Sequence, residues 1–185
     1  TLGSDFSFMA SFVNGSPDET GYGPFIDLVF PTTGVDGAGV EIDDGVDFLS
    51  ATDLGQAVTA VTLTFPGPDP IGCVDHPYAV ALGTGAPLEV CGPAGDTLVV
   101  LQLPFGSFTP GQPAAVVAVN AHLSDLADVD TALNIHYRGG FQFGATPTND
   151  WCCSDATILS HTNTDPATWP GQPVTPTLLA VTKSA

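Results

Sequence analysis

The chain has 185 residues, of which 43% are apolar, so it can bury a core and is not an acidic disordered chain. Arg138 and Lys183 are its two basic residues against 20 Asp and Glu, which gives a formal net charge of −18. This charge argues against nucleic acid and anionic membranes as partners, because both are bound through basic contacts, and it favours divalent cations.

Alternating apolar and polar residues, which are typical of half-buried strands, recur along the chain. The runs are, in chain order, DFSFMASFV, AVTAVTLTF, TLVVLQLPF, AAVVAVNAHL, TALNIHYRG, FQFG and TPTLLAVTKS. TLVVLQLPF is almost continuously apolar and predicts a central strand, and GTGA predicts a hairpin between YAVAL and LEVC. In TALNIHYRG the period places Leu133, Ile135 and Tyr137 inward and Asn134 and His136 outward. Gly- and Pro-rich turns separate these short runs, so the sequence predicts an all-β Greek-key sandwich.

Residues 144–173 interrupt this pattern with a segment of little periodicity that contains both Trp residues and two of the four Cys. Loops of this length inside compact domains are usually functional or disordered. We expect an ordered inserted loop, pinned by disulfides, within a single domain that spans residues 1–185. A terminal strand at 174–185 follows the loop and can pair within the domain, with a neighbouring subunit or with an adjacent domain.

The four Cys, together with 21 Gly and 17 Pro, indicate a secreted, loop-rich protein, and we expect it outside the cell or on its surface. No apolar run reaches transmembrane length, and TLGSDF is the start expected of a processed or excised chain. Four Cys allow three pairings within the chain. One joins Cys73 to Cys91 and leaves Cys152 beside Cys153, whereas the other two staple the long loop to the hairpin. We favour the staple, because adjacent cysteines point to different sides of an extended chain; a bond between subunits and a zinc site at Cys152, Cys153 and His161 are alternatives.

The sequence contains no catalytic motif of a serine hydrolase, a zinc protease or a nucleotide-binding enzyme. Its four His, at positions 76, 122, 136 and 161, are scattered along the chain. We therefore predict that the protein is not an enzyme, with an unrecognised hydrolase as the third hypothesis. Trp151 and Trp169 can stack on sugar rings or anchor the loop over the sandwich, and we favour anchoring.

The stretch GVDGAGVEIDDGVD offers a candidate calcium loop. Its carboxylates are Asp36, Glu41, Asp43, Asp44 and Asp47. Their spacing fails the EF-hand pattern in every register, so any calcium would be held by irregular ligands and would have a structural role. The alternative is an acidic surface loop without a metal.

Several runs together resemble the immunoglobulin-like repeat domains of very large bacterial surface and adhesin-like proteins. They are GYGPFIDLVFPTTGVDGAGVEIDDGVDFLSATDLGQAV, GDTLVVLQLPFGSFTPGQPAAVVAVNAHLSDLADV, RGGFQFG and TPTLLAVTKS. The resemblance covers roughly residues 20–145 and the last ten residues, and the cysteines and the Trp-Cys-Cys loop depart from it. It implies an immunoglobulin-like fold and an extracellular structural or adhesive module, and it implies no enzymatic residues.

The terminal strands suggest how such a module would associate. Phe6, Phe8 and Phe12 share one face of the first strand, and Leu178, Leu179 and Val181 offer apolar side chains in the last. A strand from one subunit can complete the sheet of another through main-chain hydrogen bonds. We therefore expect a non-catalytic subunit or module of a bacterial surface fibre or adhesin that binds itself or adjacent domains through these strands. The alternatives are ordinary edge strands and a glycan-binding adhesin module, with calcium as an optional ligand.

Overall fold

The computed structural model describes residues 1–37, 44–68, 70–80, 86–143, 157–159 and 164–178. Throughout these residues the protein is all-β, and one 3-10 turn, η1 (Pro166–Thr168), accompanies the strands. The all-β prediction is confirmed. None of the described residues form a helix long and apolar enough to cross a membrane.

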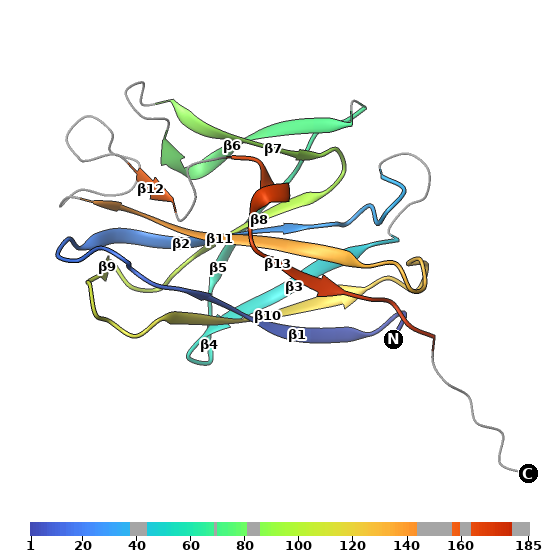
Figure 1. The fold of residues 1–185 in the computed structure, drawn as a ribbon, viewed down its shortest axis with the longest axis horizontal. Coiled ribbons are helices and arrows are strands. Elements are labelled where there is room, and N and C mark those ends of the chain that lie inside the picture. Colours follow the sequence, from blue (N-terminus) through green and yellow to red (C-terminus); the bar gives the residue numbers. More distant parts are fainter. Residues whose placement is uncertain (38–43, 69, 81–85, 144–156, 160–163, 179–185) are drawn as a thin grey trace, which may run out of the picture.

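Two antiparallel sheets form the body of the molecule (Figure 1). The four-stranded sheet has the order β1 (Asp5–Phe12), β10 (Ala115–Leu123), β3 (Val46–Asp53) and β4 (Gln56–Ala57). The larger sheet has the order β12 (Thr157–Leu159), β11 (Leu133–Phe143), β2 (Gly21–Phe30), β8 (Thr97–Gln102) and β5 (Thr59–Thr64), with β13 (Gly171–Val174) beside β11 and β9 (Ser107–Phe108) beside β2. The facing sides of the two sheets supply the main core, as expected of a sandwich.

Alternation along the strands decides which side chains enter this core. On β10, Val117, Val119, Ala121 and Leu123 are buried while the residues between them are half-buried or exposed. The predicted inward face of this strand is therefore confirmed. The immunoglobulin-like, Greek-key connection of the strands stays a prediction.

A third layer covers the outer face of the larger sheet, which a two-sheet sandwich does not include. It is the hairpin of β6 (Ile71–Val80) and β7 (Pro87–Pro93), the pairing that the sequence predicts. In Figure 1 the hairpin lies across β2, β8 and β11 on the side opposite β1 and β10. A second core fills the space beneath it, made of Phe25, Val29, Phe65, Ala79, Val90, Leu98, Val100 and Trp169. The larger sheet is thus the middle one of three layers and is buried on both faces, which explains the continuous apolar run of β8. We call it the middle sheet below.

The disulfide differs from the favoured prediction. Cys73 and Cys91 face each other across β6 and β7 and form a disulfide, with 4.0 Å between their Cα atoms. The predicted staple between this hairpin and the long loop is therefore wrong, because both hairpin sulfurs are already bonded to each other. The register of the hairpin brings the two cysteines opposite one another, and sequence spacing alone does not show that register. Cys152 and Cys153 lie outside the described residues.

The long segment after β11 returns to the larger sheet. β12 pairs with Gly140–Gln142 and β13 with Leu133–His136, so both strands lie along the edge of β11 that faces away from β2. The strand near the C-terminus therefore occupies 171–174, of which 171–173 belong to the expected loop, and residues 175–178 of the expected terminal strand are not in a strand. A backbone hydrogen bond from the Leu2 N–H to the Thr177 carbonyl holds this segment beside the N-terminus. The rest of the expected strand, 179–185, lies outside the described residues.

Candidate functional site

A buried ionic network joins the middle sheet to the hairpin. Asp27 of β2 and Arg138 of β11 are directly opposite in the strand register. The Arg138 Nε–H donates to Asp27 Oδ2 over 2.8 Å, and neither side chain has any exposed surface. Burial lowers the pKa of Arg138, and the Asp27 carboxylate opposes that shift by its charge and its hydrogen bond.

His76 of β6 completes the network from the hairpin. Its Nδ1 accepts hydrogen bonds from the backbone N–H groups of Tyr78 and Ala79, over 3.1 and 2.7 Å. Because Nδ1 accepts twice, the ring proton is on Nε2, which donates to Asp27 Oδ1 over 2.9 Å. Both ring nitrogens are thus engaged and the side chain is fully buried, so His76 is a structural anchor and cannot serve as an accessible general base.

Trp169 covers the other side of Arg138. The guanidinium carbon lies 4.0 Å from the centre of the indole ring, a cation–π contact, and Trp169 is only 3% exposed. A sugar therefore has no access to this ring, and the structure does not support the predicted glycan contact at Trp169. The preferred alternative, an anchor for the loop, fits the observed burial. Trp151 lies outside the described residues.

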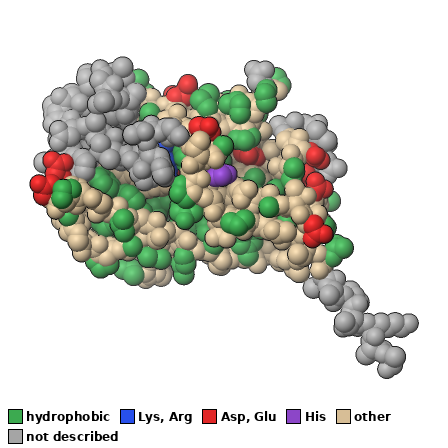
Figure 2. All heavy atoms as spheres, in the orientation of Figure 1, with side chains coloured by type: hydrophobic (Ala, Val, Ile, Leu, Met, Phe, Trp, Pro, Cys, Tyr) green, Lys and Arg blue, Asp and Glu red, His purple; other side chains and the backbone are tan. Residues whose placement is uncertain are grey.

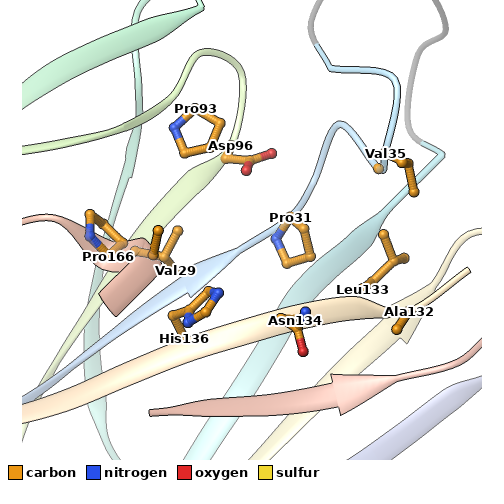
Figure 3. A pocket seen from close by; sticks show the side chains of 12 residues that line it. Val29, Pro31, Val35, Pro93, Asp96, Ala132, Leu133, Asn134, His136 and Pro166 are labelled. Atoms are coloured by element: carbon orange, nitrogen blue, oxygen red, sulfur yellow. The ribbon is translucent and has the colours of Figure 1, made fainter. Parts of the chain in front are cut away.

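A cleft of about 230 Å³ opens beside this anchor, on the outer face of the middle sheet. Figure 3 shows His136 and Asn134 of β11 on one side of the cleft and Asp96, which precedes β8, on the other. The His136 Nδ1–H donates to the Trp169 carbonyl over 3.1 Å, since a carbonyl only accepts, and Nε2 of the neutral ring is left as an acceptor. Asn134 is exposed as predicted, whereas His136 is half-buried beside η1.

Asp96 is the acidic group of the cleft and is 5% exposed. Its Oδ1 accepts hydrogen bonds from the backbone N–H and the hydroxyl of Thr33, over 3.2 and 2.8 Å. Burial raises the pKa of Asp96, the Thr33 hydrogen bonds oppose the shift, and the nearby Asp44 carboxylate adds to it. The carboxyl is therefore fixed in place but easier to protonate than an exposed aspartate.

The candidate calcium ligands that the structure describes differ in burial. Asp36 is exposed, Asp44 is buried, and Asp47 is half-buried opposite His122 of β10. Within the described ranges, the one group of three possible metal ligands with converging atoms is Cys73, Glu89 and Cys91, and its sulfurs form the disulfide. Glu41 and Asp43 lie outside these ranges, so a calcium site in this loop stays a prediction.

The residues expected to mediate assembly have mixed positions. Phe6 and Phe8 are half-buried against the main core and Phe12 is buried in it, so these rings stabilise their own subunit and are not free for a partner. Leu178 is 69% exposed. Leu179 and Val181 lie outside the described residues.

No family model, curated protein or solved structure matches the chain. The buried network was not among the residues that the sequence singled out. One signal was present in the sequence. Arg138 is one of two basic residues, and its position in the alternating strand puts it on the face opposite Leu133 and Ile135, which we expected to be exposed to solvent. The need for a buried partner for that charge could have pointed to Asp27 within the apolar run FIDLVF.

Proposed function

We propose that the protein is a non-catalytic extracellular structural module, a subunit or repeat of a bacterial surface fibre or adhesin, which associates by strand addition at β1. The observation that carries this proposal is the free edge of the smaller sheet. β1 pairs with β10 on one side, and no strand of the described chain pairs with its other side. The engagement of His76 by its own subunit adds support for a structural rather than a catalytic role.

The hydrogen-bond pattern shows which groups this edge presents. The Leu123 N–H donates to the Ser4 carbonyl, and Asp5 is opposite His122, so the even-numbered residues of β1 exchange hydrogen bonds with β10. The N–H and C=O groups of Asp5, Ser7, Met9 and Ser11 therefore point to the open side. Their side chains are also exposed.

Most of the devices that usually protect an edge strand are absent from β1, in which Asp5 is the one charged residue. Such edges carry Lys, Pro or a bulge that prevents pairing with another chain. DFSFMASF contains neither Lys nor Pro, and its register with β10 is continuous. An added strand would find a continuous, eight-residue template. The segment that begins at Leu178, which is exposed, is the proposed donor from a neighbouring subunit.

The test removes one hydrogen-bond donor from the edge. Met9 is 65% exposed and its N–H points outward, so Met9→Pro blocks strand addition and leaves the bonds to β10 in place. Met9→Thr is the matched control, since it changes the same side chain and keeps the N–H. Sedimentation velocity and electron microscopy at physiological salt should show assemblies for the wild type and Met9→Thr, and folded monomers for Met9→Pro.

Truncation after Leu178 then tests the donor. Monomers would identify residues 179–185 as the added strand, whereas assemblies that persist would mean that β1 pairs with another edge. A wild-type protein that stays monomeric at high concentration, or a Met9→Pro variant that still assembles, would contradict the proposal.

A further inference from the structure

The cleft beside η1 has a composition that the structural role does not require. Its walls are apolar and stiff, formed by Val29, Pro31, Pro93, Leu133 and Pro166. Three polar side chains, Asp96, Asn134 and His136, interrupt these walls from opposite sides (Figure 3). Small-molecule sites have this character, a mostly apolar hollow with a few placed polar groups. With about 230 Å³ the cleft is smaller than sites for drug-sized ligands and suits a single ring.

The polar groups select the chemistry of the ligand. His136 Nε2 is an acceptor, the Asn134 amide offers a donor and an acceptor, and the Asp96 carboxyl accepts or, when protonated, donates. A hydroxyl group both donates and accepts, so a ring with several hydroxyls can satisfy all three. Among the residues that the structure describes, no Lys or Arg lines the cleft, and the net charge of −18 repels anions.

The cleft is also held in shape before any ligand arrives. His136 is fixed by the Trp169 carbonyl and Asp96 by Thr33. Asp165 caps η1 by accepting from the Ala167 N–H over 3.1 Å. Fixed side chains lose little conformational entropy on binding, which favours recognition of a small ligand.

We propose that this cleft binds one neutral hexose ring, free or as the terminal unit of a surface glycan. Its non-polar C–H faces would pack on Pro31 and Pro93, and its hydroxyls would bond Asp96, Asn134 and His136. The proposal moves glycan recognition away from the buried Trp169 ring. It is independent of assembly, because the cleft lies on the outer face of the middle sheet and β1 lies in the other sheet.

The test is a ¹H–¹⁵N NMR titration of the whole chain with glucose, galactose, mannose and N-acetylglucosamine, and with glucuronate as the anionic comparison. At least one neutral hexose should shift the amide signals of 134–136 and 166–167 with millimolar affinity, and glucuronate should not. Asn134→Ala should weaken binding about five- to tenfold, the effect of losing one hydrogen bond. Ala167→Trp, which fills the cleft from an exposed position, should abolish it.

Asn120→Ala, on the outer face of the smaller sheet, is the matched control and should bind as the wild type does. The folded state of each variant is checked by its spectrum. Absence of cleft shifts with all four neutral sugars, or shifts that survive both Asn134→Ala and Ala167→Trp, would overturn the proposal.

A glycan array distinguishes a free hexose from the terminal hexose of a surface glycan as the ligand. Array binding without any cleft shift from a free hexose would also overturn it, because the recognised unit would then be larger than one ring.

Discussion

Replacing Asp27 with asparagine should destabilise the protein more than most single substitutions. Asp27→Asn keeps the shape of the side chain and removes the charge that faces Arg138 Nε at 2.8 Å. Asparagine has one oxygen where the carboxylate has two, so its NH₂ group must take the place of Oδ1 or Oδ2 and face either His76 or Arg138. His76 cannot adapt by moving its proton to Nδ1, because that atom accepts from Tyr78 and Ala79.

The magnitude follows from the burial of the pair. Removing one partner of a buried ion pair costs about 3–5 kcal/mol, because the remaining charge has no solvent to replace the lost contact. Asp27, His76 and Arg138 have no exposed side-chain surface, so the full range applies. Since domains are stable by about 5–15 kcal/mol, the variant should be close to unfolding. With a urea m-value of about 2 kcal/mol/M, the midpoint should fall by roughly 1.5–2.5 M.

Urea unfolding followed by circular dichroism and by tryptophan fluorescence measures this loss. Asp18→Asn, at an exposed position, is the matched control and should change the free energy of unfolding by less than about 0.5 kcal/mol. In a double-mutant cycle with Arg138→Met, the double variant should lose less than the sum of the single losses, since no unpaired guanidinium remains. A loss below about 1 kcal/mol for Asp27→Asn would refute the reasoning, because the network would then have to be hydrated.

Three further variants test other parts of the structure. Replacing Cys73 and Cys91 with serine removes the disulfide that closes a loop between residues 18 apart, and should lower the free energy of unfolding in urea by about 3 kcal/mol. Equal stability of the variant and the wild type would count against the hairpin disulfide. Burial raises the pKa of Asp96 above 3.8, so the folded state binds this proton more tightly than the unfolded chain and loses stability as the pH rises through the raised pKa. Asp96→Asn should therefore gain stability relative to the wild type at pH 7, and the gain should vanish below about pH 3.8; a difference independent of pH would contradict this sign. A Cβ on Gly139 would lie 2.1 Å from Phe12 Cδ2, so Gly139→Ala should lower the free energy of unfolding by about 1–3 kcal/mol in thermal or urea unfolding. Gly15→Ala, where the space is open, should be nearly neutral. Equal effects of the two substitutions would show that the core rearranges to accept the added methyl group.

Strand positions were predictable because each strand carries its own signal. The alternation in AAVVAVNAHL is set by burial of every second side chain, and the structure buries Val117, Val119 and Ala121 as that period requires. The hairpin around Cys73 and Cys91 was likewise local, since its two strands are close in sequence. Such features can be predicted from the local sequence, without knowing which distant residues they contact.

The third layer and the buried network depended on distant contacts. Outward-facing positions of β11 are predicted to be solvent-exposed until the hairpin covers them, and only then does Arg138 need Asp27 and Trp169. The cleft has the same origin, because Asp96, Asn134 and Pro166 come from three separate parts of the chain. The sequence supplied the residue types, and the docking of the third layer brings them together.

Burial of Arg138 has a consequence for assembly. Lys183 lies outside the described residues, so no Lys or Arg side chain of the described chain is exposed. Figure 2 shows acidic side chains spread around the face of the molecule that is in view. Two such surfaces repel each other, and the β1 edge offers neutral backbone groups rather than ion pairs. Added salt shortens the range of repulsion to about 8 Å at physiological ionic strength and about 3 Å at 1 M. Assembly at β1 should therefore strengthen with sodium chloride, measured by sedimentation velocity. Association that weakens with salt would instead indicate that attraction between opposite charges outweighs this repulsion, and would contradict the charge argument.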